Sequence, residues 1–270
     1  MRYLRFGKRA ARLDEGRRIY AIGDVHGCYD QLAHLVQLIE LDGVQRGAAD
    51  TRLIFLGDMI DRGPKSREVV ELLYELHDSE NVICLRGNHE QTMVDVLRGD
   101  MEAMRFWLSF GGAETIVSWG VERELVVHAS LGESWQREVL EAFRAVVPPS
   151  IIRWMAGLPT YHREGGYFFV HAGIRPGTPL DAQSEEDMLW IREPFLSSWR
   201  QHEAVVVHGH TETQTATTGG NRIGVDTGAY RTGCLTAVGL QGSDQWIIDT
   251  APESRLAATP TETERLAVAG

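Results

Sequence analysis

The sequence contains few cysteines, and their placement predicts no thiolate metal site. The chain of 270 residues has three, Cys28, Cys84 and Cys234, and no C-x-x-C pair. An odd number without this spacing argues against both a disulfide framework and a thiolate zinc site. Such cysteine usage is typical of a reducing compartment, so we expect a cytoplasmic protein.

Long hydrophobic runs and an excess of basic residues are also absent. No apolar run approaches the roughly 18 residues of a membrane-spanning helix, and the basic N-terminal stretch is not followed by the apolar core of a signal peptide. Acidic residues outnumber basic ones by 38 to 27, and the formal net charge is −11, which argues against a nucleic-acid-binding surface. We expect neither a membrane nor a nucleic acid as partner.

The length and composition predict one globular domain. A chain of 270 residues with 43% apolar content can bury a large core, and we expect a single domain over residues 1–250. Residues 251–270 lack aromatic side chains and contain Pro252 and Pro260. This composition predicts a flexible tail.

The first third of the chain repeats the order strand, polar loop, helix. Short apolar strands are predicted at 18–22, 53–56 and 82–85. Glycine and polar residues follow each strand, and then come apolar residues with the spacing of an amphipathic helix. The pattern predicts two β-α-β units.

Strands return in the last third of the chain. Segments 167–170 and 204–207 are apolar and each leads into histidine. Segments 222–225, 234–240 and 245–248 are separated by short, glycine-containing connections, which predicts an antiparallel meander closing a second sheet.

Between the two groups of strands, residues 101–166 predict an inserted helical cap. Its bulky aromatic residues include Phe106, Trp107, Trp119, Trp135 and Trp154. We expect the cap to lie over the site and to set substrate choice rather than to catalyse. Replacing Trp107 should then change the ranking of substrates.

Five predicted strands stop at side chains that bind metals. These are Asp24, His26, Asp58, Asn88, His171 and His210. Because function collects beyond the carboxyl ends of strands in open α/β sheets, we expect them to converge. They exceed what one ion needs, so two metals bridged by Asp58 are predicted. Oxygen and imidazole ligands without thiolate indicate manganese, iron or zinc.

Five ordered motifs resemble those of the phosphoprotein phosphatase family. The stretches GDVHG, GDMIDRG, LRGNHE, VHAG and GHT look like the bacterial and phage branch of these serine/threonine phosphatases, which are calcineurin-like dinuclear metallophosphoesterases. The resemblance covers residues 18–230. It implies an α/β fold in which a two-sheet β-sandwich is flanked by helices in the order α/β/β/α, with an inserted helical cap.

The resemblance also implies a role for each motif residue. The first metal would be held by Asp24, His26 and Asp58, and the second by Asp58, Asn88, His171 and His210. His89 would be the general acid, oriented by Asp61.

Three arginines are expected to bind phosphate. Arg62 and Arg86 lie inside the motifs, and Arg192 resembles a third phosphate-binding arginine of the bacterial branch. Tyr230 lines the cleft in one interpretation and packs inside the meander in the other. Glu212 stands where related phosphoesterases ending in G-H-x-H have a second histidine.

We therefore expect a hydrolase that dephosphorylates phosphoserine and phosphothreonine in proteins or peptides. A metal-bridging hydroxide would attack phosphorus while His89 protonates the leaving group. The cofactors would be two divalent ions, manganese first, with iron or zinc as alternatives.

Two other functions stay open. A symmetrical dinucleoside tetraphosphate hydrolase shares the GDVHGCYD stretch, although Asp61 argues against it because those relatives tend to lose the acidic residue before the arginine. A catalytically silent phosphoprotein-binding module would use the same scaffold. The complete ligand set argues against that module.

Overall fold

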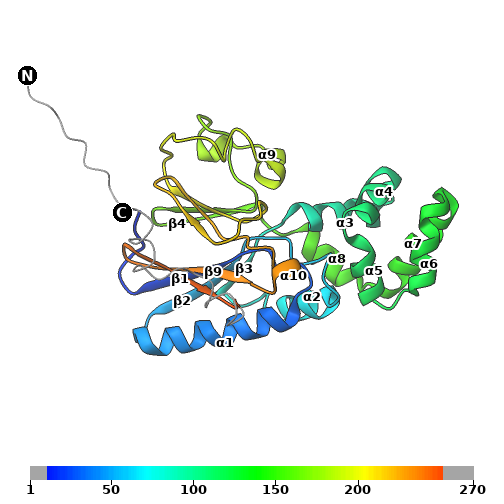
Figure 1. Ribbon diagram of the computed structural model, residues 1–270, viewed down its shortest axis with the longest axis horizontal. Coiled ribbons are helices and arrows are strands. Elements are labelled where there is room, and N and C mark those ends of the chain that lie inside the picture. Colours follow the sequence, from blue (N-terminus) through cyan, green and yellow to red (C-terminus); the bar gives the residue numbers. More distant parts are fainter. Residues whose placement is uncertain (1–10, 252–270) are drawn as a thin grey trace, which may run out of the picture.

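The computed structural model describes residues 11–251, and two five-stranded sheets form its centre (Figure 1). The first sheet has the order β10-β9-β1-β2-β3. Its strands are β1 (Arg17–Ile22), β2 (Asp50–Phe55), β3 (Val82–Cys84), β9 (Thr236–Gln241) and β10 (Asp244–Asp249). Strands β1, β2 and β3 are parallel, whereas β9 pairs antiparallel with both β1 and β10.

The second sheet has the order β4-β5-β6-β8-β7. Its strands are β4 (Tyr161–Glu164), β5 (Tyr167–Val170), β6 (Val205–His208), β7 (Thr217–Thr218) and β8 (Arg222–Gly224). The central strands β5, β6 and β8 are parallel, and β4 and β7 pair antiparallel at the two edges.

The two sheets pack face to face through alternate residues of their strands. Ile19 and Ala21 of β1 belong to the same buried cluster as Phe169 of β5 and Val207 of β6. Successive residues of a strand point to opposite faces of the sheet. The intervening residues of each sheet therefore face outward, where helices cover them.

Helices complete the two outer layers. Ile22 packs with Leu32 of α1 on one outer face, and Val170 packs with Met188 of α9 on the other. Figure 1 shows α1 and α9 on opposite sides of the paired sheets. The α/β/β/α order implied by the resemblance is thus confirmed. The flanking helices are α1 (Tyr29–Arg46), α2 (Ser66–Glu75), α3 (Asn88–Arg98), η2 (Leu180–Ala182), α9 (Glu185–Trp190) and α10 (Ala229–Thr232).

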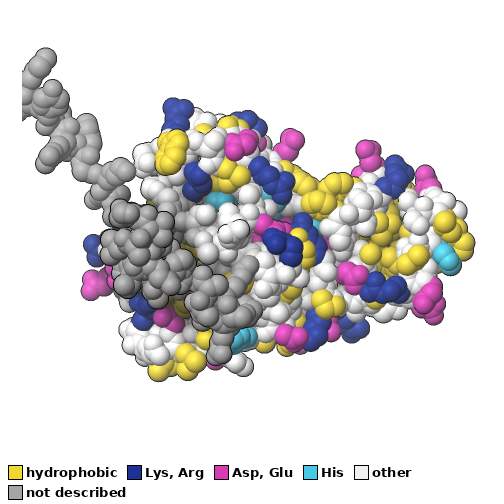
Figure 2. Space-filling model, viewed as in Figure 1, with side chains coloured by type: hydrophobic (Ala, Val, Ile, Leu, Met, Phe, Trp, Pro, Cys, Tyr) yellow, Lys and Arg dark blue, Asp and Glu magenta, His cyan; other side chains and the backbone are white. Residues whose placement is uncertain are grey.

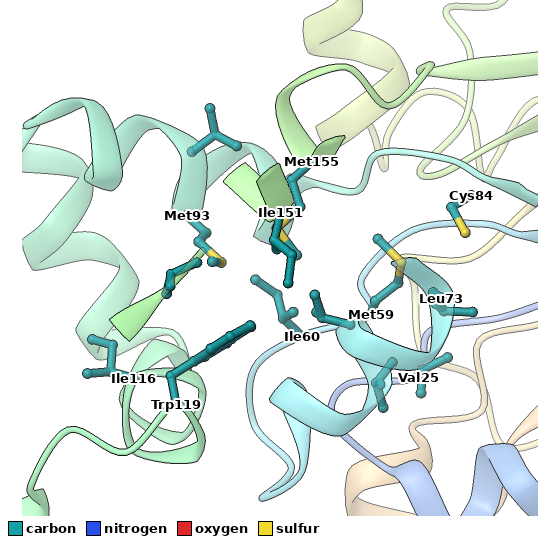
Figure 3. Close-up of a cluster of buried hydrophobic side chains, with 14 of the residues drawn as sticks. Val25, Met59, Ile60, Leu73, Cys84, Met93, Ile116, Trp119, Ile151 and Met155 are labelled. Atoms are coloured by element: carbon teal, nitrogen blue, oxygen red, sulfur yellow. The ribbon is translucent and has the colours of Figure 1, made fainter. Parts of the chain in front are cut away.

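The inserted segment is helical and shares a core with the strand-end loops. Its helices are α4 (Met101–Ser109), α5 (Gly112–Ser118), α6 (Arg123–His128), η1 (Ala129–Leu131), α7 (Glu133–Val146) and α8 (Pro149–Ala156). Figure 3 shows Trp119 and Ile151 of the insert beside Ile60, and these residues belong to the same buried cluster as Ile116 and Met59. This continuous core makes the insert part of the domain rather than a detached lid.

Two sequence-based boundaries differ from the structure. The helical insert ends at Ala156, and residues 161–164, which we expected inside it, form β4. The expected meander does not close the second sheet. Only β8 lies there, parallel to β6, whereas β9 and β10 extend the first sheet along the free edge of β1. The pattern of short strands with glycine turns identifies the β9–β10 hairpin but cannot say which sheet edge it covers.

The predicted tail lies outside the described residues except for Ala251. Within residues 11–251, no helix combines the length and the apolar character needed to cross a bilayer.

Candidate metal centre

The six predicted metal ligands converge where five strands end. Asp24, His26, Asp58, Asn88, His171 and His210 are all buried, the most accessible being His210 with 6% of its surface exposed. Backbone hydrogen bonds join the loops that carry them: the amides of Val25 and His26 donate to the carbonyl of Asp58, at 3.1 and 2.9 Å. The amide of Gly209 donates to the carbonyl of His171 at 2.8 Å. The strand ends therefore form one continuous floor.

Strained backbone is concentrated in this floor. Within residues 11–251, five residues other than glycine have positive φ: His26 (46°), Asp58 (49°), Asp61 (76°), Arg62 (66°) and His210 (62°). This region costs free energy for side chains with a Cβ, and it persists where the surroundings fix the backbone, commonly at functional sites. All five were predicted site residues from the motifs.

Two glycines let the backbone come close to the carboxylates. A Cβ at Gly87 would lie 2.2 Å from Oδ1 of Asp58, and one at Gly209 would lie 2.0 Å from Oδ1 of Asp24. No side chain fits at these distances. The glycines before Asn88 and His210 are therefore required by space rather than by turn geometry.

The histidines present unprotonated nitrogens to the centre. Nδ1 of His26 lies 2.7 Å from the carbonyl of Ile60, and Nδ1 of His171 lies 3.0 Å from that of Leu56. Burial lowers the pKa of both imidazoles well below the ordinary value. A neutral ring that donates through Nδ1 has a lone pair on Nε2, and metal-ligating histidines are oriented in this way.

Acceptor atoms face one another around His171. Its Nε2 lies 2.8 Å from Oδ1 of Asn88 and 3.1 Å from Nδ1 of His210, and 3.4 Å from Oδ1 of Asp58. The unprotonated Nε2 of His171 does not attract the oxygens of Asn88 and Asp58 at such distances, whereas a divalent cation among these atoms would bind all of them. These residues fit a metal site.

Asp58 is common to two groups of potential ligands. Its carboxylate lies with His26 and His89 in one group and with His171 and His210 in the other. Asp24 belongs to neither group; burial and the neighbouring charges of Asp226 and Asp58 raise its pKa well above the ordinary value. Carboxylates this close are stabilised by bound cations. The donor set fits two ions with Asp58 between them.

His89 is held by a buried carboxylate. Its Nδ1 lies 2.5 Å from Oδ2 of Asp61, and Asp61 is fully buried. Burial favours the neutral ring, but the charges of Asp58 and Asp61 and the hydrogen bond to Asp61 outweigh it, and the pKa of His89 is raised. This arrangement turns Nε2 toward the centre, 3.7 Å from Oδ2 of Asp58.

The insert holds Asp61 in place, which the sequence did not predict. Nε1 of Trp107 donates to Oδ2 of Asp61 at 2.7 Å, and the hydroxyl of Thr115 donates to Oδ1 at 2.6 Å. Trp107 is fully buried and so cannot contact a substrate. The expectation that the cap selects substrates without supporting catalysis is therefore wrong for this tryptophan.

Glu90 is a second supporting residue without an assigned role in the sequence analysis. Its buried carboxylate accepts hydrogen bonds from the amides of Asp58 (2.9 Å), Met59 (2.8 Å) and Gly87 (2.8 Å). Burial and the charge of Asp58 raise the pKa of Glu90 to about 7. The carboxylate fixes two of the ligand-bearing loops relative to each other.

Two of the three predicted arginines border the centre. Arg62 lies 3.5 Å from Nε2 of His89 and 3.3 Å from Glu212, and Arg192 donates to the carbonyl of His210 at 3.4 Å. Arg86 contacts Glu185 (3.0 Å) and the carbonyl of Ala156 instead of any of the six ligands.

Tyr230 also borders the centre and does not belong to a meander. It lies in α10, its ring meets the His26 ring edge to face at 5.5 Å, and its hydroxyl donates to Glu212 at 2.8 Å. Glu212 thus holds Arg62 and Tyr230 together and contacts no predicted ligand. Asp226, beside Asp24, is a further buried carboxylate, and burial with the charges of Glu212 and Asp58 raises its pKa to about 7.

His208 and His128 lie away from the centre. The His208 ring packs edge to face against Phe195 at 5.0 Å, and burial lowers its pKa to about 4. His128 packs against Trp135 at 4.9 Å. Although His208 is only two residues from His210, its side chain therefore does not join the proposed metal ligands.

Fold and donor set together define a dinuclear metallophosphoesterase scaffold, and comparison with known proteins agrees. The family described as "Calcineurin-like phosphoesterase" matches residues 17–234, so the chain belongs to that family. The family implies two divalent ions, for which the residues around Asp58 are candidate ligands.

Curated relatives of the chain include tetraphosphatases. The chain is 30% identical over 188 residues to a symmetrical bis(5'-nucleosyl)-tetraphosphatase of Aromatoleum aromaticum, covering 70% of this chain and 51% of the relative. It is 26% identical over 238 residues to an asymmetrical one, PrpE, of Halalkalibacterium halodurans, covering 80% and 87%. The chain thus spans about half the length of the symmetrical enzyme but most of the asymmetrical one.

Solved structures share the fold at low identity. A proposed diadenosine tetraphosphatase superimposes with a TM-score of 0.61 at 20% identity, over 88% of this chain and 98% of that one. A cold-active protein tyrosine phosphatase superimposes with a TM-score of 0.52 at 17% identity, over 90% and 83%. The metallophosphoesterase superfamily is confirmed, whereas the curated relatives do not support the narrower protein-phosphatase branch.

Proposed function

We propose that the protein is a metal-dependent hydrolase of dinucleoside tetraphosphates. The observation that carries this proposal is the similarity to the asymmetrical tetraphosphatase of Halalkalibacterium halodurans over 80% of this chain and 87% of the relative. The symmetrical form of this function was one of the two alternatives to a protein phosphatase that the sequence left open. We now place tetraphosphate hydrolysis first because relatives named as symmetrical and as asymmetrical tetraphosphatases both match the chain.

His89 is the proposed general acid. Hydrolysis forms a bond from water oxygen to phosphorus and breaks the bond from phosphorus to the leaving oxygen, which takes up a proton. Nδ1 of His89 is occupied by Asp61, so Nε2 is the nitrogen that can deliver this proton. The raised pKa favours the protonated ring before the transfer.

Arg62 and Arg192 are the proposed phosphate-binding residues. Both guanidinium groups lie at the mouth of the centre, next to His89 and His210 respectively. Their planar donors suit phosphoryl oxygens, which carry more negative charge as the bond breaks. Arg86 could join them only by leaving Glu185.

The proposed ligands are Asp24, His26 and Asp58 for one ion, and Asp58, Asn88, His171 and His210 for the other. When bound, two divalent ions lower the pKa of water and neutralise phosphoryl charge. Manganese is the proposed metal, with iron or zinc as alternatives, because the donors are oxygens and imidazoles without thiolate.

A second candidate, hydrolysis of phosphoserine or phosphothreonine in proteins and peptides, is favoured by the His89–Asp61 pair. A serine alkoxide is a far poorer leaving group than a nucleotide phosphate and depends more on a general acid. The 2.5 Å contact and the two further hydrogen bonds to Asp61 suit such a requirement.

The test compares both substrates on one manganese-loaded preparation. We expect a higher kcat/KM for diadenosine tetraphosphate than for a phosphoserine peptide, with Asp58→Asn as the inactive control. Products of ADP alone would assign symmetrical cleavage, and AMP with ATP would assign asymmetrical cleavage. A higher kcat/KM for the peptide would support the second candidate instead. If neither substrate were hydrolysed, the result would favour a catalytically silent phosphoprotein-binding module.

A further inference from the structure

A row of aromatic rings leads from the proposed general acid to the surface. Phe110 stacks on His89 at 4.9 Å with an interplanar angle of 19°, and Phe106 stacks on Phe110 at 5.0 Å and 24°. Trp190 meets Phe106 edge to face at 5.9 Å and His210 at 6.4 Å. The rings therefore connect His89 with the ligand His210 along one side of the centre.

Two rings of this row are exposed. Phe106, in α4 of the insert, has 42% of its surface accessible, and Trp190, the last residue of α9, has 36%. Figure 2 shows hydrophobic side chains gathered between α9 and the neighbouring helices of the insert. Single exposed aromatic residues are common, but two that touch across different segments at the mouth of a site indicate a binding surface.

We infer that Phe106 and Trp190 form a platform on which a nucleobase of the substrate stacks. The inference rests on the proposed function. Phe106, Phe110 and His89 are nearly parallel, and Trp190 stands at 61° to Phe106, so a planar base that stacks on one of the two exposed rings meets the other at its edge. An aromatic side chain offers a face to any base, so the stacking contact does not depend on which base is bound.

The platform lies beside the two arginines that are proposed to bind phosphate. Arg192 follows Trp190 by two residues and contacts the His210 backbone. The guanidinium carbon of Arg62 lies 5.2 Å from the centre of the Phe110 ring. A nucleotide with its phosphate at these arginines would have its base directed along the aromatic row. A phosphopeptide offers no planar group that must accompany the phosphate.

The platform should recognise ring shape rather than base identity. Its two exposed members, Phe106 and Trp190, offer ring faces and the indole N–H, without the paired donors and acceptors that read a base edge. We expect diadenosine and diguanosine tetraphosphate to be hydrolysed with kcat/KM values within a few-fold of each other.

The first test is binding to the manganese-loaded protein, measured by calorimetry. AMP and ribose 5-phosphate carry the same phosphate, and only AMP has a base. We expect the native protein to bind AMP about tenfold more tightly or better, which is the stacking contribution expressed as an affinity ratio. Phe106→Ala and Trp190→Ala should each bring this ratio toward one, and the exposed Trp199, changed to Ala, is the matched control.

The second test is kinetic and uses inorganic tetrapolyphosphate, which has the anhydride chain without bases. In Phe106→Ala, the ratio of kcat/KM for diadenosine tetraphosphate to that for tetrapolyphosphate should fall about tenfold, whereas Trp199→Ala should keep the native ratio. An unchanged ratio, with AMP still preferred over ribose 5-phosphate, would overturn the platform while leaving the hydrolase proposal intact. Failure of the native enzyme to cleave diadenosine tetraphosphate would instead overturn the proposed function.

Discussion

The centre and its rim are built by different means. In the centre, Asp58, Asp61 and His89 are at most 2% exposed, and each makes polar contacts to more than one neighbour. At the rim, Phe106 and Trp190 are 42% and 36% exposed, and their side chains contact neighbouring aromatic rings. A fixed polar network suits chemistry that tolerates little displacement. Aromatic contacts at the surface can be changed without disturbing this network, and they are therefore suited to determining which substrate binds.

The largest expected effect lies in the centre. Asp58→Asn should lower kcat/KM for diadenosine tetraphosphate by at least about 10³-fold, because one carboxylate serves both ligand groups. The fold should survive, since Asn has nearly the same shape, and circular dichroism checks it. Asp30→Asn, at an exposed carboxylate that pairs with Lys65, is the matched control and should keep full activity. Substantial turnover by the Asp58 variant would refute a shared ligand.

His89→Asn should separate substrates by leaving group. We expect a loss of about 10²–10⁴-fold on a phosphoserine peptide, the range for a missing general acid. Nitrophenyl phosphate should lose much less, because nitrophenolate leaves without a proton. Comparable losses on both esters would mean that His89 acts only through its charge.

Trp107→Phe tests whether the insert supports the centre. The variant keeps a buried ring but removes the hydrogen bond to Asp61, and a hydrogen bond to a charged group contributes about 1.5–3 kcal/mol. We expect kcat to fall by about tenfold on the peptide and on diadenosine tetraphosphate alike, with KM unchanged. The basic limb of the pH profile should also move, because it reports His89.

Trp119→Phe is the control for this change. Trp119 is equally buried, and its Nε1 has no hydrogen-bond partner among residues 11–251, so its loss should leave kcat near the native value. If Trp107→Phe changed the ranking of substrates instead of kcat, Trp107 would belong with the rim.

The smallest effect is expected far from both regions. Glu164 of β4 pairs with Arg17 of β1 and Arg52 of β2 and so ties the two sheets together. Burial disfavours its charged form, but hydrogen bonds from His162 and Arg17 and the charge of Arg52 outweigh this and lower its pKa. Its contribution to stability is therefore present above the unfolded pKa of about 4.5 and is lost as pH falls through the folded value.

Glu164→Gln should accordingly lower the free energy of unfolding by about 1 kcal/mol at pH 7 and leave kcat unchanged. The difference from the native protein, measured by urea unfolding, should shrink as pH falls below 4.5. A difference that grew in acid would exclude the ion pairs as its cause.

The same contrast explains what the sequence could predict. The ligands in the centre follow short apolar strands, and parallel strands bring their carboxyl ends to one edge, so Asp24, Asp58 and Asn88 could be grouped without coordinates. The spacing of residues along the chain was sufficient for this grouping. The same spacing could not assign the β9–β10 hairpin to the first sheet, because packing between distant segments determines which sheet edge a hairpin joins.

Contacts between distant segments also account for the residues that were missed or misread. Trp107 reaches Asp61 across 46 positions, so an aromatic residue in a helical cap gave no sign of supporting the acid. Phe106 and Trp190 belong to separate elements, α4 and α9, and neither stands in a motif. Only the folded chain brings these side chains together.

The central claim is that Asp58 joins two ions in one buried centre, and electron paramagnetic resonance of the manganese-loaded protein tests it most directly. We predict that binding saturates at two manganese ions per chain with an exchange-coupled spectrum, and that Asp58→Asn loses the coupling. A single ion at saturation, or two ions with the hyperfine pattern of isolated manganese in the native protein, would contradict the account.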